Sequence, residues 1–242
     1  MNIEEIVEWF NRERTPALTP GEVQELYFQL HPRTAFLKNL PNGARVVDIG
    51  AGDGSLSLFR GWPRPVRQDL KMYAYSIEKG EHFDKFDGYE ISDWNVAPPS
   101  FDGIDFDALV SAHFIEHVAD PTSLADWMRR KLRPDGRAYI EWPSEASLTL
   151  PGIDEVKGRG VDLMITRFDD DDTHQAALPA RDRMRSALVA QGFEIEQEGV
   201  IRLPWIEDQL MASFRNADDV FCRQAAFWLA TGWSQFIVAR RR

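Results

Sequence analysis

The stretch VVDIGAGDGS (Val46–Ser55) joins an apolar run containing Asp48 to three glycines at alternate positions. The run begins at Arg45 as RVVDI and lacks the alternation of a half-exposed strand, which is typical of a short strand buried on both faces. A glycine loop directly after such a strand lets a ligand lie against bare backbone. In a sheet with helices on both faces, ligands bind beyond the carboxyl ends of the strands. The stretch therefore predicts a ligand-binding loop at that edge of a sheet.

Strand and helix patterns alternate along the rest of the chain. Further strands are predicted over residues 72–77, 106–112, 137–142, 193–201 and 234–239, and helices over 121–132, 179–191 and 218–230. Asp120 is expected to cap the first of these helices, with Pro121 at its first position. Strands that alternate with helices form a parallel sheet, so the predicted fold class is α/β, doubly wound and mostly parallel. The long connection before the last strand permits an antiparallel edge.

The residues before the sheet predict a helical N-terminal cap. Apolar side chains recur at helical spacing over residues 3–10 and again over 23–30. TPGE (Thr19–Glu22) is a capping box with proline in the first turn, and Pro32 is expected to end the second helix. We predict a single domain over 1–242, made of the cap (1–40), a cofactor-binding half (41–145) and a substrate-side half (146–242).

Composition narrows the class of protein. The 242 residues carry 28 basic and 39 acidic side chains, a formal net charge of −11, which argues against nucleic acid or an anionic membrane as partner. No apolar run approaches the roughly 20 residues that cross a bilayer. The acidic start MNIEEIVEWF differs from a signal peptide, and Cys222 is the single cysteine. We therefore expect a cytoplasmic protein.

The glycine spacing distinguishes between ligands. Dinucleotide-binding loops follow G-x-G-x-x-G, whereas Gly50, Gly52 and Gly54 give G-x-G-x-G with Ser55 at the third dinucleotide position. A phosphate-binding P-loop needs Gly-Lys-Ser/Thr, and no lysine occurs between residues 38 and 71. Asp48 is unfavourable beside a pyrophosphate and favourable beside a cation. The loop therefore argues against a dinucleotide and a nucleoside triphosphate, and is compatible with a cationic ligand.

VVDIGAGDGS resembles the first motif of class I S-adenosylmethionine-dependent methyltransferases. YSIEKG, ISDWN, FDALVSAHFIEHVADP and LRPDGRAYIEWPSE resemble their later motifs, in the correct order. The resemblance implies a Rossmann-like, seven-stranded methyltransferase sheet, S-adenosylmethionine as cofactor and S-adenosylhomocysteine as product. It further implies that Asp48, Gly50, Ala51 and Gly52 contact the cofactor.

The second and third motifs imply contacts to the nucleoside. Glu78 is similar to the acid that holds the ribose hydroxyls, and Asp93 and Trp94 are similar to the pair that meets the adenine amino group and packs on the ring. Glu78 comes later after the loop than is usual in the family, because RGWPRPVRQDLK (Arg60–Lys71) resembles an insertion. Asp69 is therefore an alternative for the ribose.

His113 ends the fourth motif's strand, where relatives place residues that line the methyl-transfer site. Histidine suits proton removal near neutral pH, so His113 is the first candidate for a base or for positioning the acceptor, and a passive contact with the cofactor is the alternative. HFIEH (His113–His117) is similar to the E-x-x-E-H with which small-RNA 2′-O-methyltransferases and ubiquinone-pathway O-methyltransferases bind a divalent metal. His113 replaces the first glutamate and makes the site richer in nitrogen, and we predict no metal. The alternative is a metal held by Glu116 and His117, which match the pattern, with His174 as the distant ligand.

Two later segments carry weaker signals. The acidic loop RFDDDDTHQAALP (Arg167–Pro179) falls where related enzymes form a substrate lid, so His174 is a second candidate for the acceptor site, with a solvated acidic run as the alternative. The aromatic segment Leu203–Trp233 is predicted to be mainly core. A cover over the acceptor site or a homodimer contact is its alternative role.

These observations predict transfer of a methyl group to a small molecule, most commonly at oxygen, with saccharides, quinone precursors and natural products as the acceptors that the resemblance implies. The alternatives are a metal-dependent RNA 2′-O-methyltransferase, a non-catalytic cofactor-binding protein of the same fold, and, against the loop spacing, a nicotinamide dehydrogenase. The acceptor class rests on analogy, because one fold supports many reactions.

Overall fold

The computed structural model describes residues 1–175 and 177–242. The chain divides into two compact units. The helical unit comprises Met1–His31, Pro143–Leu178 and Val200–Gln235, and the sheet unit comprises Pro32–Trp142, Pro179–Gly199 and Phe236–Arg242. Each unit is therefore built from three separate stretches of the chain.

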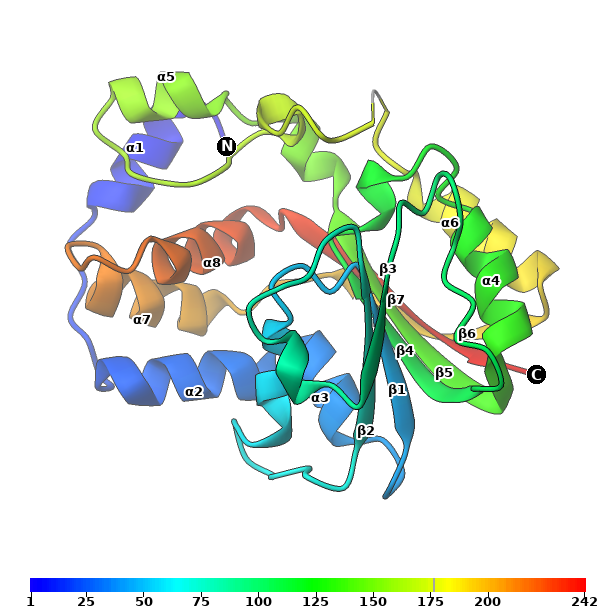
Figure 1. The fold of residues 1–242 in the computed structure, drawn as a ribbon. Helices are drawn as coiled ribbons and strands as arrows, with labels where there is room; N and C mark the ends of the chain where they lie inside the picture. The colour runs from blue at the N-terminus through cyan, green and yellow to red at the C-terminus, as the bar shows by residue number, and fades with distance from the viewer. Residues whose placement is uncertain (176) are drawn as a thin grey trace. The chain divides into compact units, whose positions relative to one another are not determined.

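The sheet unit is formed around seven strands in the order β3-β2-β1-β4-β5-β7-β6 (Figure 1). The strands are β1 (Arg45–Ile49), β2 (Lys71–Ser76), β3 (Gly88–Ile91), β4 (Phe106–Ala112), β5 (Leu132–Pro143), β6 (Phe193–Val200) and β7 (Ser234–Arg241). β1 pairs in parallel with β2 and β4, β2 with β3, and β4 with β5. The carboxyl ends of these five strands therefore lie at one edge, as the sequence predicts.

Three α-helices belong to the sheet unit: α3 (Pro32–Lys38), α4 (Ser123–Lys131) and α6 (Arg181–Ala190). α4 and α6 lie side by side in Figure 1. On α3, the ring of Phe36 lies 5.8 Å from that of Tyr139 on β5. Short 3-10 helices complete the unit: η1 (Ser55–Arg60), η2 (Phe83–Lys85) and η3 (Ile115–His117).

The helical unit contains α1 (Ile3–Asn11), α2 (Pro20–Leu30), α5 (Ile153–Gly158), α7 (Pro204–Phe214) and α8 (Val220–Thr231), with 3-10 turns η4 (Glu145–Thr149) and η5 (Phe168–Asp170). Figure 1 shows α7 packed along α8, with α2 beside α7 and α5 beside α1. Thr19 caps α2 and forms the predicted capping box with Glu22. Among the described residues, no helix has the length and apolar character needed to span a membrane.

Two local predictions were wrong, and some elements were not predicted. Pro32 begins α3 instead of ending helical structure, because proline suits the first turn of a new helix. The helix expected to start at Pro121 starts at Ser123, since the Asp120 carboxylate binds Thr122 in a turn one step earlier. The 3-10 helix η1, which follows the glycine loop, was not among the predicted helices. The edge strand β3 was not predicted.

Candidate functional site

The glycine loop folds against β2 and lies at the carboxyl end of β1. The backbone N–H groups of Gly50 and Ala51 both donate to the carbonyl oxygen of Tyr75, each at 2.9 Å, and that of Gly54 donates to the carbonyl of Ala51 at 2.8 Å. These donors are therefore used within the protein, whereas a phosphate-binding loop turns its N–H groups toward the ligand. This geometry fits a cofactor without phosphate, as the spacing predicts.

Gly50 cannot be replaced without moving its neighbours. Its φ of +82° lies in the left-handed region, and a Cβ there would lie 2.6 Å from the Cβ of Phe114. Phe114 follows β4 directly, so the first glycine allows the loop after β1 to pack on the segment after β4.

Asp48 is buried beneath the loop, 5% exposed, and lines a cavity of about 100 Å³. Arg33 on α3, Gly50, Ala51 and Ala112 are among the other residues of this cavity. Burial raises the pKa of the Asp48 carboxyl to about 7, although the Arg33 cation opposes that shift. The cavity therefore presents a carboxyl group, from Asp48, and a guanidinium cation, from Arg33, beside the glycine loop. Sequence reasoning did not identify Arg33, because the helix that carries it was not predicted.

The two candidates for the ribose lie at opposite ends of β2. Glu78 is exposed, two residues beyond the carboxyl end of the strand, and Gly80 beside it packs against the glycine loop. Asp69 precedes the strand, at the amino end, and is held there by other groups. Its carboxylate accepts two hydrogen bonds from the guanidinium of Arg67, at 3.0 and 2.9 Å, and one from the N–H of Gly43 at 2.8 Å.

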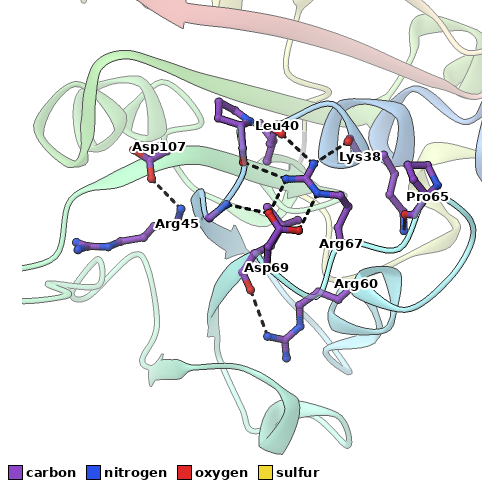
Figure 2. A network of polar contacts seen from close by, with 11 residues as sticks. Lys38, Leu40, Arg45, Arg60, Pro65, Arg67, Asp69 and Asp107 are labelled. Atoms are coloured by element: carbon purple, nitrogen blue, oxygen red, sulfur yellow. Dashed lines mark hydrogen bonds and ion pairs between the residues drawn. The ribbon is translucent and has the colours of Figure 1, made fainter.

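The Asp69 contacts belong to a structural network (Figure 2). Arg67 is 7% exposed and also donates to the carbonyl oxygens of Lys38, Leu40 and Pro41, which ties the Arg60–Lys71 segment to the turn before β1. Hydrogen bonding to Arg67 holds the pKa of Asp69 far below its usual range. Asp69 is thus engaged away from the ligand edge, and Glu78 is the better placed acid.

Asp93 and Trp94 follow β3 and have different environments. Asp93 is exposed and its Oδ1 accepts from the N–H of Asn95 at 2.9 Å. Trp94 is 6% exposed and its indole N–H donates to Ser123 at 2.8 Å. The Trp94 ring lies 5.3 Å from the ring of Phe114. Trp94 therefore packs on Phe114, the residue that contacts Gly50 of the glycine loop.

His113 is held between two carboxylates at the carboxyl end of β4. Its Nδ1 lies 3.1 Å from Glu116 Oε1 and its Nε2 lies 3.2 Å from Glu141 Oε1. Burial, the largest effect, lowers the pKa of His113, but the hydrogen bonds to both glutamates outweigh it and raise the pKa to about 9. Glu116 and Glu141 are 0% and 3% exposed. Sequence reasoning missed Glu141, which stands 28 positions from His113 and reaches it through the strand register that pairs Ala112 with Glu141.

His174 belongs to the helical unit. Its Nδ1 donates to the carbonyl oxygen of Phe168, and its ring stacks on that of Phe168 with centroids 4.5 Å apart. The acidic loop around it is ordered by Asp170, whose carboxylate accepts from the N–H groups of Ile153, Thr166 and Arg167. Ala176 of this loop lies outside the described residues.

A family described as a methyltransferase domain matches residues 21–198, which is more than half of the chain. The ubiquinone biosynthesis O-methyltransferase of Xylella fastidiosa (strain 9a5c) is 31% identical over 112 residues, which are 43% of this chain and 44% of that protein. The chain thus matches less than half the length of this relative.

Two solved structures share the fold. A S-adenosylmethionine-dependent methyltransferase from Mesorhizobium loti superposes with a TM-score of 0.55 at 16% identity, over 87% of this chain and 96% of that one. Phosphoethanolamine N-methyltransferase 2 of Haemonchus contortus, in complex with phosphomonomethylethanolamine and S-adenosylhomocysteine, gives 0.56 at 17% identity, over 97% and 56%. These identities support likeness of fold and no more.

Proposed function

Because this chain belongs to the family of S-adenosylmethionine-dependent methyltransferases, we propose that it methylates a small-molecule acceptor at oxygen. The observation that carries the acceptor class is the match to an O-methyltransferase of ubiquinone biosynthesis. The net charge of −11 supports a small molecule over nucleic acid. Quinone precursors, saccharides and natural products are the proposed acceptors. A cytoplasmic location and a homodimer stay predictions.

The cavity beneath the glycine loop fits the amino-acid end of S-adenosylmethionine, which carries an ammonium and a carboxylate. We assign the ammonium to Asp48 and the carboxylate to Arg33, which line the cavity together. In this arrangement each charge of the cofactor meets a protein group of opposite sign, whereas a phosphate would meet Asp48 and a loop whose N–H groups at Gly50 and Ala51 are already used.

The nucleoside end is assigned to the loops after β2 and β3. Glu78 is exposed beyond β2 and would accept hydrogen bonds from the ribose hydroxyls, while Asp93 beyond β3 would accept from the adenine amino group. Ala51 and Gly52 provide backbone beside them. His113 and His174 remain the residues proposed for the acceptor side.

S-adenosylmethionine would supply the methyl group by in-line displacement at its methyl carbon, in which the bond to the acceptor oxygen forms as the bond to sulfur breaks and S-adenosylhomocysteine leaves. The protein's main contribution is to hold the acceptor oxygen close and aligned, which by itself supplies several kcal/mol in such reactions. Water must be kept from the sulfonium, and the acceptor must lose one proton as the new bond forms.

The proposal is tested by calorimetric titration followed by an acceptor screen. We expect S-adenosylmethionine and S-adenosylhomocysteine to bind and NAD to fail. We then expect release of S-adenosylhomocysteine with members of a panel of phenols, saccharides and quinone precursors. Turnover with structured RNA that requires Mg²⁺ would support the RNA alternative instead. Binding of both sulfur ligands without turnover on either panel would support the non-catalytic alternative.

A further inference from the structure

The backbone of His113 is held in an unusual conformation. Its φ is +53°, in the left-handed region that non-glycine residues adopt rarely and that costs conformational energy. Its N–H donates to the carbonyl oxygen of Glu141 at 2.9 Å, so β5 fixes the chain where β4 ends. Strain that persists next to a proposed substrate site indicates a side chain whose direction matters.

The side chain of His113 is fixed from both sides. Glu116 on η3 faces Nδ1, and Glu141 on β5 faces Nε2. The second oxygen of Glu141 accepts a hydrogen bond of 2.6 Å from the hydroxyl of Tyr139, two residues earlier on the same face of β5. Tyr139 is itself fully buried, so Glu141 cannot turn away from His113 without leaving a buried hydroxyl without this acceptor.

This arrangement determines what the imidazole ring can do. A carboxylate only accepts hydrogen bonds, so a ring nitrogen that faces one carries a proton. With a carboxylate at each nitrogen, His113 donates twice and has no lone pair with which to take a proton from an acceptor. Two buried carboxylates around one histidine are expensive to desolvate, which makes fold stability a poor explanation for them. Glu116 Oε2 adds to that cost, since it is buried without a hydrogen-bond partner among the described residues.

We propose that Glu141 is a positioning residue for methyl transfer: anchored by Tyr139, it fixes the His113 ring at the end of β4 as a double hydrogen-bond donor. The inference rests on the proposed function only in placing His113 on the acceptor side. Its consequence is that His113 is no general base. The proton of the acceptor must then go to another group or to water, which favours a hydroxyl more acidic than that of an aliphatic alcohol, such as a phenol.

The direct test is nitrogen NMR of the histidine rings, on protein labelled at histidine and kept in EDTA to exclude bound metal. The His113 signals are assigned by their loss in His113→Gln. We expect the wild type to show two protonated ring nitrogens at pH 7.5, and Glu141→Gln to show one protonated and one unprotonated nitrogen. Tyr139→Phe removes only the anchoring hydroxyl and is expected to broaden or shift the same signals. Glu196→Gln, which alters a partly exposed ion pair with Arg137 on the neighbouring part of the sheet, is the matched control and should leave them unchanged.

Activity gives an independent readout with any acceptor found in the screen. Glu141→Gln should lower kcat at least tenfold while the S-adenosylhomocysteine affinity stays within twofold, and Glu141→Asp should recover part of the loss. Phenolic acceptors should be turned over at least tenfold faster than matched aliphatic alcohols.

A wild-type ring with one unprotonated nitrogen would overturn the inference, as would an unchanged His113 spectrum in Glu141→Gln. If Glu141→Gln fails to fold, Tyr139→Phe decides by the same spectrum. Failure of the wild type to bind S-adenosylhomocysteine would instead contradict the proposed function, and the NMR result would still decide the role of Glu141.

Discussion

Gly80 lies so close to Gly52 that a Cβ added to Gly80 would be 2.4 Å from the carbonyl oxygen of Gly52. The contact joins the loop after β2 to the glycine loop after β1, and the N–H of His82 adds a hydrogen bond of 2.9 Å to the carbonyl of Asp53. The loop after β1 and the loop after β2, which we propose to hold the amino-acid end and the ribose of the cofactor, are therefore packed against each other. A substitution that separates them is expected to weaken cofactor binding.

Gly80→Ala is expected to weaken S-adenosylmethionine binding at least tenfold, because the clash is with backbone and must displace one of the two loops. Calorimetry on both proteins measures the change. Gly21→Ala is the matched control, since a Cβ at Gly21 on α2 meets nothing within 4 Å. Equal affinities for Gly80→Ala and the wild type would show that the loops move apart without cost to binding.

The affinity for S-adenosylmethionine is expected to rise with pH through neutrality. The pKa of the Asp48 carboxyl is raised to about 7 by burial, so most molecules carry it protonated at pH 6 and ionised at pH 8. Pairing with the cofactor's ammonium favours the ionised form, and the affinity should therefore increase roughly tenfold between these values and then level off. The measurement is calorimetry at pH 6, 7 and 8.

Asp48→Asn is the variant that isolates this effect. It should bind weakly at every pH and lose the rise between pH 6 and 8. A rise of equal size in Asp48→Asn would assign the titration to another group.

Substitution of Glu78 is expected to change cofactor affinity but not stability, and substitution of Asp69 is expected to change stability but not affinity. Glu78→Ala should weaken binding of S-adenosylmethionine at least tenfold and leave the thermal midpoint unchanged, because Glu78 is exposed. Asp69→Ala should leave the affinity unchanged and lower the stability by about 1 kcal/mol, the usual size for a partly exposed ion pair. Calorimetry and thermal unfolding of both variants check this, and the reverse pattern would assign the ribose to Asp69.

Arg33 is expected to recognise the carboxylate of the cofactor. Arg33→Gln should therefore weaken binding of S-adenosylmethionine by about tenfold or more, corresponding to at least 1.4 kcal/mol. Decarboxylated S-adenosylmethionine lacks the group in question and should bind both proteins alike. If Arg33→Gln weakened both ligands equally, Arg33 would act through the shape or charge of the cavity and not through the carboxylate.

The sheet could be predicted where its strands are buried on both faces. β1 and β4 were predicted with their observed bounds, because apolar runs of that length between turn signals leave few alternatives. β3 has four residues and alternates between half-buried and exposed positions at the edge of the sheet, so its pattern is too short to predict. α3 was missed because proline both follows helices and begins them.

The candidate site was predictable only in its local part. The glycine loop, Glu78 and Asp93 follow strands in sequence, and their place at the carboxyl edge follows from parallel pairing. Glu116 lies three residues from His113 in the sequence, whereas the second partner of His113 and the cation near Asp48 depend on tertiary structure. Glu141 reaches His113 through the register of β4 with β5, and Arg33 reaches the Asp48 cavity through the packing of α3. Neither of these two contacts can be predicted from the spacing of the residues along the chain.

The use of the Gly50 and Ala51 N–H groups by the Tyr75 carbonyl limits how this protein can be redesigned. Replacing Ser55 by glycine and Leu56 by lysine, ahead of Ser57, would reproduce the letters of a nucleotide-triphosphate site without supplying its backbone donors. Freeing those donors would mean separating the end of β1 from β2, where Ile49 pairs with Tyr75. A change of cofactor class in this scaffold therefore requires a new path of the main chain, and exchange of side chains alone is insufficient.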